Sequence, residues 1–322
     1  LGNIWGSGID KARDERIFTA WSAYDAQEKT ENRPSTKCAI EETLIATTFT
    51  ERHIENWPVW RGKSSHGTAM LMAGIVYDLE IHLNHTATSS ESDTAQGAKD
   101  KFHQTLSNFT DPFVDPEESD SDFDAANFNY SVTAWEGALS RPVISDEREF
   151  GYRNLEDLEH VIEGIIDSNG IFRCKVKAFG KFLVGEEIIN PPYSVPTRND
   201  SRVGSFHLRL GSFEAEKWKT THSPEVQAKL FEQAEKYGGF LMFRNGLRVM
   251  PYGREDNDYF EIEKRRGKHA GRWFWANRRL FGRVALTSQA NYNLRDKAGR
   301  EGIIDNKAAK VFRDIVINIL LE

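Results

Sequence analysis

The stretch that decides the fold reads GGFLMFRNGLRVMPYG and occupies positions 238–253. Its apolar residues fall in two short runs on either side of Asn245-Gly246. That dipeptide accepts the positive φ angles that a two-residue hairpin turn requires. The pattern therefore predicts two antiparallel strands, at 240–244 and 247–250, and a β-sheet to which they belong.

A helix is predicted immediately before this hairpin. Ser223 is a typical N-cap, Pro224 suits the first helical position, and Gly238 suits the C′ position that follows a helix. One face of the intervening segment is apolar, which predicts that the helix packs on the sheet. The residues expected on that face are Val226, Leu230, Phe231, Ala234 and Tyr237.

Further elements are predicted on both sides of this unit. Apolar residues at helical spacing predict a helix that begins at Asn154. A turn is predicted over 167–170, and the alternating pattern of 171–179 predicts a strand. After the hairpin, the composition of 281–288 predicts a strand. A last helix is expected over 305–321, with Asp305 as its N-cap. The apolar faces expected of the two helices consist of Leu155, Leu158, Val161, Ile162 and Ile165, and of Val311, Phe312, Ile315, Val316 and Ile319.

The first third of the chain has a different character. Residues 17–25 and 43–50 are rich in Thr, aromatic and β-branched residues and are predicted to be strands, and 68–83 begins as an apolar strand. The polar segment 85–101 and the acidic, Pro-containing segment 111–122 are predicted to be solvated loops.

Strands with helices interposed on one side of the sheet predict an α+β fold. A chain of 322 residues is long enough for two domains. We place the boundaries where the composition changes. This gives a first domain over 1–84, a polar and acidic linker over 85–124, and a second domain over 125–322.

The composition limits the compartment and the partners. The formal net charge of −7 means that contact with nucleic acid requires a local basic patch. Cys38 and Cys174 are far apart, which favours a reducing cytosol, and each is expected to be buried as a small apolar residue. His82 and His85 have no third ligand nearby, so no metal site is expected. No apolar run reaches the roughly 20 residues that span a bilayer. We therefore expect a cytoplasmic protein, or a nuclear one in a eukaryote, with no membrane partner.

A second informative segment, NLRDKAGREGIIDN at 293–306, precedes the last predicted helix. It gathers the cations Arg295, Lys297 and Arg300 in one loop. A cation brought from one domain to a triphosphate held by another stabilises the nucleotide and the charge that develops during phosphoryl transfer. The alternative is a solvated helix start in which Arg295 and Asp296 form a surface pair worth under about 1 kcal/mol.

These two segments in this order resemble the transducer region of MORC-like ATPases of the GHKL superfamily, which includes gyrase, heat-shock chaperones, histidine kinases and MutL. The resemblance is specific over about 240–321, and the motifs LSNFTDPF at 106–113 and GSFHLRLGSFE at 204–214 support it. It implies that 1–84 is the end of a Bergerat-type α/β sandwich. The rest, 125–322, would then be a ribosomal-protein-like transducer domain with a left-handed βαβ crossover and helices on one face of a mixed sheet.

The resemblance also implies a function. A transducer couples the binding and hydrolysis of ATP in a neighbouring lobe to lobe closure and homodimerisation, so ATP and Mg²⁺ are the cofactors implied for the full-length protein. DNA is the partner that the family implies. The residue that reaches the γ-phosphate would be Lys297, Arg300 or Arg295.

One motif before the transducer is similar to part of a nucleotide site. Gly67-Thr68, at the start of the strand expected over 68–83, is similar to the Gly-Thr pair that lies near the adenine end of ATP in this superfamily. The alternative is an ordinary turn. A complete site also needs a helical Glu and Asn, a D-x-G-x-G loop and a glycine lid, none of which occurs in the sequence. We therefore expect that the chain alone does not hydrolyse ATP and that a longer protein begins before Leu1.

Residues 264–283 indicate a rival class of function, because they hold eight Lys or Arg and no acid. Cations interleaved with aromatic rings neutralise phosphates and stack on bases, as a non-enzymatic nucleic-acid-binding module requires. Alternatively, the aromatic residues pack inward and the arginines line a lobe interface. A structural dimerisation piece is a third hypothesis. The candidate nucleic-acid contacts are Lys264, Arg265, Arg266, Arg272, Arg278 and Arg279.

Overall fold

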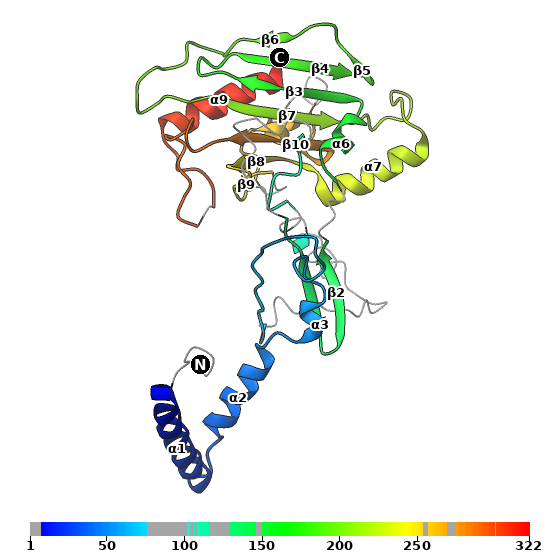
Figure 1. Ribbon diagram of the computed structural model, residues 1–322. Helices are drawn as coiled ribbons and strands as arrows, with labels where there is room; N and C mark the ends of the chain where they lie inside the picture. The colour runs from blue at the N-terminus through cyan, green and yellow to red at the C-terminus, as the bar shows by residue number, and fades with distance from the viewer. Residues whose placement is uncertain are drawn as a thin grey trace. The chain divides into compact units, whose positions relative to one another are not determined.

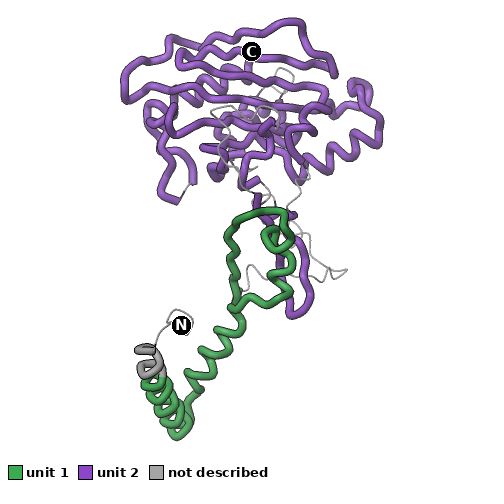
Figure 2. Tube along the Cα trace, viewed as in Figure 1, with its two compact units in different colours: residues 1–80 green, residues 81–322 purple. Residues whose placement is uncertain are grey.

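The computed structural model of the chain contains two compact units, residues 1–80 and 81–322 (Figure 2). Each unit is described by itself. The structure describes residues 8–75, 102–103, 106, 108–115, 129–145, 150–253, 257–268, 275–299 and 301–322.

The described part of the first unit is helical, with α1 (Gly8–Thr30), α2 (Thr36–Ala46) and α3 (Glu51–Ile54). The strands predicted over 17–25 and 43–50 are therefore wrong. Each window is short, and the first is flanked by Ala, Lys, Glu and Arg. Their summed helix propensity outweighs the β preference of a few Thr and aromatic residues.

Side-chain caps fix the start of α2. The Ser35 hydroxyl accepts a hydrogen bond from the Cys38 amide at 3.1 Å, and the buried Glu28 carboxylate accepts one from the Thr36 amide at 2.8 Å. Cys174 is buried as predicted, but Cys38 is exposed on the surface of α2. The prediction of two buried cysteines is thus half wrong, because α2 has no buried face in the described structure.

The second unit is an α+β structure with one large mixed sheet, which confirms the predicted class (Figure 1). The strand order is β5-β4-β3-β7-β10-β8-β9, and β6 pairs with β4. β10 runs parallel to β8 and antiparallel to β7, and the connection from β8 to β10 contains α8 (Ile262–Lys268). The strands are β3 (His160–Ile166), β4 (Phe172–Ala178), β5 (Lys181–Phe182), β6 (Glu187–Ile189), β7 (Phe206–Ser212), β8 (Gly239–Arg244), β9 (Leu247–Arg248) and β10 (Leu280–Leu286).

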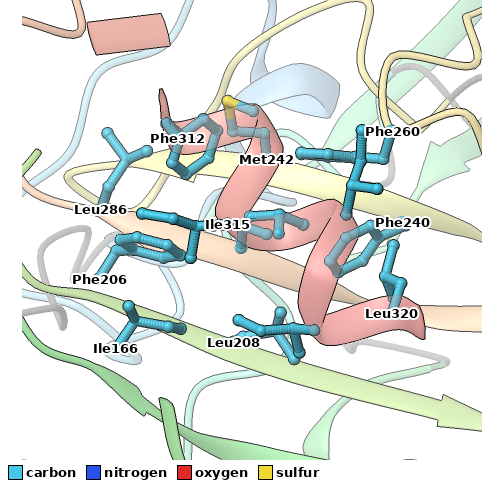
Figure 3. Close-up of a cluster of buried hydrophobic side chains, with 14 of the residues drawn as sticks. Ile166, Phe206, Leu208, Phe240, Met242, Phe260, Leu286, Phe312, Ile315 and Leu320 are labelled. Carbon is cyan, nitrogen blue, oxygen red and sulfur yellow. The ribbon is translucent and has the colours of Figure 1, made fainter. Parts of the chain in front are cut away.

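One face of this sheet is covered by α9 (Lys307–Leu321). Figure 3 shows Phe312 and Ile315 of α9 among the strand residues Phe206, Leu208 and Met242. Every apolar residue predicted for the inner face of this helix is buried, which confirms that face.

The start of α9 differs from the prediction by one position. The cap is Asn306, whose side-chain oxygen accepts a hydrogen bond from the Ala309 amide at 2.9 Å, and not Asp305. The Asn306 amide nitrogen also donates to the Asn293 carbonyl at 2.8 Å, so this residue ties the helix to the preceding loop.

Helices cover the opposite face as well, which corrects the prediction of helices on one face only. A second cluster there joins α6 (Tyr152–Glu156) and α7 (Pro224–Tyr237) to Phe113, Phe243 and Phe281. The reason is that β7, β8 and β10 are buried along their whole length. Side chains alternate between the two faces of a strand, so burial on both faces requires a cover on each side.

The predicted limits of α7 are largely confirmed. The Ser223 hydroxyl accepts a hydrogen bond from the Val226 amide at 3.4 Å, and Pro224 opens the helix. Leu230, Ala234 and Tyr237 are buried, while Val226 and Phe231 remain partly exposed and Gln227 is buried in their stead. Gly238 has an extended backbone with φ −62°, so it is not the left-handed C′ residue that was predicted.

The helix predicted to begin at Asn154 is wrong. The short helix α6 begins at Tyr152 after the N-cap Gly151 and ends at Glu156, and 160–166 is the strand β3. The apolar residues of this segment satisfy a helical spacing and a buried strand equally well. The β-branched residues of HVIEGII and its glycine favour the strand. At Gly164, a Cβ would lie 1.9 Å from the Arg173 carbonyl oxygen of β4, so this strand pairing depends on glycine.

Both predicted turns are confirmed. Asn245 and Gly246 have φ angles of +49° and +71° and join β8 to β9. The Asp167 carboxylate accepts hydrogen bonds from the Asn169 and Ile171 amides, and Gly170 has a φ of +79°. Separately, β1 (Val132–Glu136) and β2 (Leu139–Ile144) form a two-stranded hairpin of their own.

Residues 108–115, here called the docked segment, lie against the sheet. The Asp111 amide donates to the Gly246 carbonyl at 3.0 Å, and the Arg248 amide donates to the Phe109 carbonyl at 2.9 Å. Thr110, Asp111 and Phe113 are buried. Residues 111–113 of the predicted solvated loop 111–122 are therefore buried and 114–115 are partly buried, while the remainder of that loop lies outside the described residues.

The packing of α9 gives the first prediction. Phe312→Ala removes a fully buried ring and should lower the free energy of unfolding by about 3–5 kcal/mol. Leu321→Ala, on the partly exposed end of the same helix, should lower it by less than about 1 kcal/mol. Urea unfolding measures both values, and equal effects would contradict this assignment of the core.

Candidate functional site

The loop after β10 holds the predicted phosphate-sensing residues. Its two sides pair through the Lys297 amide, which donates to the Gly302 carbonyl at 2.8 Å, and through the Ile304 amide, which donates to the Arg295 carbonyl at 2.8 Å. The loop is therefore a short, paired structure and not an extended helix start.

Residues at alternate positions of this loop are anchored to the body of the unit. Leu294 is buried, and the Asp296 carboxylate lies 3.2 Å from the Nε atom of the buried Arg244 of β8. On the returning side, the Ile303 amide donates to the Tyr252 hydroxyl at 2.8 Å. The intervening Arg295 and Lys297 are exposed.

The predicted surface pair between Arg295 and Asp296 does not form, since Asp296 pairs with Arg244. Within the described residues, the side chains of Arg295 and Lys297 have no ion-pair partner. Two cations without counter-ions on an anchored loop form a surface to which an anion can bind. Arg300 lies outside the described residues.

A neighbouring loop, 198–205, is held against this one by asparagines. The Asn291 side chain accepts a hydrogen bond from the Gly204 amide at 3.0 Å, and the Asn293 side chain donates to the Asn199 and Arg202 carbonyls at 2.6 and 2.9 Å. The contact places the exposed Arg202 near the candidate loop. Sequence reasoning missed this residue, because nothing in its local pattern links it to residues some 90 positions later.

The predicted nucleotide contacts Gly67 and Thr68 lie in the first unit. They are exposed and belong to no strand, so the prediction that they open a strand is wrong for residues 68–75. Nothing but the Val59 side chain, at 3.6 Å, would contact a Cβ at Gly67. That position therefore does not show the close backbone approach that would require glycine.

The basic run on α8 is largely neutralised by one carboxylate. Glu261 accepts from Lys264 at 2.8 Å, from Arg265 at 3.0 Å and from Arg313 at 2.9 Å. These contacts, with the Lys264 hydrogen bond first, lower the pKa of Glu261. Arg266 lies 3.6 Å from Glu263. Three of the six predicted nucleic-acid contacts thus already have acidic partners.

Two further predicted contacts lie just before β10, on η2 (Asn277–Arg279). Arg278 is exposed, and Arg279 is partly buried. Burial lowers the pKa of Arg279, and the nearby positive charges of Arg266 and Arg278 add to this effect. The acidic Glu214 and Glu216 act in the opposite direction, so Arg279 lies among both basic and acidic residues. Arg272 lies outside the described residues.

A buried charge cluster on the sheet was not predicted at all. Glu163, Arg209 and Arg283 lie opposite one another on β3, β7 and β10. Arg209 is 1% exposed and donates hydrogen bonds to the Glu163 carboxylate and the Phe113 carbonyl. The Arg283 Nε atom lies 2.5 Å from the Asp111 carboxylate.

The histidine of this cluster, His207, is neutral. Burial first, and then the charges of Arg283 and Arg209, hold the pKa of His207 well below its usual value. Its Nδ1 atom lies 2.9 Å from Arg283 Nη1, so the neutral ring accepts a hydrogen bond from the arginine. Two arginines are then balanced by two carboxylates, Glu163 and Asp111. Since the two arginines, Asp111 and His207 are buried and only Glu163 is partly exposed, the cluster serves the structure rather than a ligand.

A sequence signal for this cluster does exist. The strands FHLRLGS and LFGRVAL each place one arginine at the centre of an apolar run. A long cation in a strand that is buried on both faces requires a buried carboxylate. Asp111 in the acidic segment supplies one of them.

Other kinds of site find no support in the described part of the chain. No group of three or more His, Cys, Asp or Glu residues is arranged there to hold a metal ion. Among the helices that the structure describes, none combines the length and apolarity needed to cross a membrane. The pair His82 and His85 lies outside the described residues.

Comparison with known proteins assigns no family, because no family model, no curated protein and no solved structure matches the chain.

The buried charge cluster gives the second prediction. Asp111→Ala leaves the Arg283 charge buried without its carboxylate and should lower the free energy of unfolding by about 3–5 kcal/mol. The matched control is Asp200→Ala, which removes an exposed pair with Lys307 at 2.8 Å and should cost less than about 1 kcal/mol. Chemical denaturation measures the free energy of unfolding of both variants. A small decrease in Asp111→Ala would show that the buried pair is not needed for stability.

Proposed function

We propose that this chain is the transducer part of a GHKL-type, MORC-like ATPase. In this role it couples the binding and hydrolysis of ATP in an adjoining lobe to lobe closure and homodimerisation. The observation that carries the proposal is the loop 293–306, in which Arg295 and Lys297 have no counter-ion among the described residues while Asp296 anchors the loop to buried Arg244.

This geometry suits the recognition of a triphosphate. A γ-phosphate is attracted most strongly by a cation that does not first have to break an ion pair with a carboxylate. Electrostatic stabilisation of phosphoryl transfer also requires that the cation be held in place before the reaction. The anchors at Leu294, Asp296 and Ile303 fix the backbone that carries Lys297. Arg300, in the same loop, is a further candidate from the sequence.

The nucleotide chemistry belongs to the full-length protein. ATP and Mg²⁺ would be held by the adjoining lobe. In this proposal the chain by itself does not hydrolyse ATP. The family resemblance supports DNA as the partner of the assembled dimer, in the cytoplasm or the nucleus.

The third prediction concerns Lys297 in the full-length protein. Lys297→Ala should lower the turnover of ATP at least tenfold, equivalent to about 1.4 kcal/mol of barrier. Lys310→Ala, which removes an exposed lysine from α9, should leave turnover unchanged. Wild-type turnover in Lys297→Ala, Arg295→Ala and Arg300→Ala alike would reject the phosphate-sensing loop.

A second candidate function is nucleic-acid binding by the basic segment 264–283. The observation in its favour is Arg278 of η2, which is exposed and has no acidic partner among the described residues. Such a cation can attract a polyanion. The carboxylate contacts of Lys264, Arg265 and Arg266 reduce the size of this patch.

The fourth prediction tests that candidate on a duplex oligonucleotide. If the patch binds, the affinity of the chain falls steeply with salt, and Arg278→Ala reduces the slope of log K against log salt by about 0.9. Lys217→Ala, at an exposed lysine outside the patch, should leave the slope unchanged. No change of slope in Arg278→Ala would remove the patch from consideration.

A further inference from the structure

The outer end of the sheet, formed by β4, β5 and β6, exposes many large apolar side chains. Phe182 is 62% exposed, and Val184 is fully exposed at 102%. Exposed apolar residues scattered singly need no explanation, but a contiguous group marks an interaction surface. The group consists of Ile165, Phe179, Phe182, Leu183, Val184 and Ile188.

Cations lie among these residues on one face of β4. Arg173, Lys175 and Lys177 occupy alternate positions, so their side chains point to the same side of the sheet. The strand register sets Arg173 opposite both Ile165 and Ile188, and Lys177 opposite Phe182. Lys181 pairs with Ala178, so its side chain lies on the other side of the sheet, at the edge next to Phe182. We call this group of apolar and basic residues, together with Lys181, the β4–β6 surface.

Four cations of this surface outnumber the three acidic residues beside it, Glu163, Glu186 and Glu187. Glu163 lies opposite Lys175 and is already paired with Arg209. Lys175 and Lys181 have no ion-pair partner within the described residues. Lys177 lies over the Phe182 ring at 5.7 Å and donates to a backbone carbonyl. Arg173 has only a distant partner, the half-exposed Glu186 at 4.0 Å. An anionic partner therefore complements this face.

The sheet edge formed by β5 and β6 has an irregular backbone that disfavours pairing with another strand. The Leu183 amide donates to the Val176 carbonyl at 2.8 Å, and the next pairing joins Glu187 to Cys174. The edge strand uses more residues than β4 between these two points, so Val184 bulges outward. A bulge interrupts the hydrogen-bonding row that an added strand would need.

Two other partners fit the surface less well. A second copy of the chain, docked by the same face, would bring like charges together. A nucleic acid would use the cations and Phe182, but it offers nothing for the aliphatic Leu183 and Val184.

We propose that the β4–β6 surface docks on an anionic lipid membrane. Phe179, Phe182, Leu183 and Val184 enter the headgroup region, and the lysines around them approach the anionic headgroups. Apolar side chains surrounded by Lys and Arg are the usual composition of interfacial membrane contacts. The expectation of no membrane partner rested on runs long enough to span a bilayer, which such a contact does not need. The proposal is independent of the ATPase hypothesis.

The test is co-sedimentation of the intact chain with vesicles of phosphatidylcholine, alone or with 30% phosphatidylserine. Binding to the phosphatidylserine vesicles alone, weakened by salt, is the expected result. Val184→Glu should reduce that binding at least tenfold. Lys175→Ala with Lys181→Ala should reduce it roughly 25-fold, because each cation near an anionic leaflet contributes about a fivefold gain.

The matched controls are Leu139→Glu and Lys217→Ala, which change an exposed apolar and an exposed basic residue elsewhere and should bind as wild type. Thermal unfolding checks that the bulged Val184→Glu variant is folded. Failure to sediment with either vesicle, or unchanged binding in Val184→Glu, overturns the proposal. Binding to a single-stranded oligonucleotide but not to vesicles overturns it in favour of a nucleic acid.

Discussion

The second unit depends on the pairing of charges inside its sheet. Arg209 and Arg283 sit at the centres of β7 and β10, where both faces are buried, and Glu163 on β3 balances one of them. The other is balanced only when the docked segment brings Asp111 against Arg283 and the Phe113 carbonyl against Arg209. An isolated buried charge is costly, so the docked segment must be in place for this sheet to be stable. The same segment brings Phe113 into contact with Phe150, which joins the charge cluster to the aromatic core beside it.

This constraint extends to the candidate site through the backbone. The docked segment pairs with both ends of β9 through Gly246 and Arg248, which fixes the hairpin after β8. The last residue of β8, Arg244, then holds Asp296 and with it the loop that exposes Lys297. The loop after β10 is thus positioned by contacts from the loop 198–205, from Arg244 and from Tyr252. In our proposal the result is a cation held ready for a phosphate.

Local chemistry made part of this structure predictable. The Asn245-Gly246 turn, the Ser223 cap and the buried face of α9 follow from short-range rules that tertiary contacts do not override. The predictions that proved wrong concern segments whose sequence pattern is compatible with two different structures. The apolar residues around 160–166 fit a helix or a buried strand, and the acidic residues at 111–115 suit a solvated loop until a buried arginine requires one of them. The anchored loop with Arg295 and Lys297 was predicted as a site, but its anchor Arg244 and its neighbour Arg202 depend on contacts that no local pattern contains.

Native-state hydrogen exchange tests most directly whether the stability of the sheet depends on the docked segment. The Asp111 and Arg248 amides donate to the hairpin and to the docked segment. If the charge cluster requires that segment, both amides should exchange as slowly as those of the central strand β7, by opening only with the whole unit. Rapid exchange of both amides while β7 stays protected would show that the segment leaves the sheet freely, and would contradict the account.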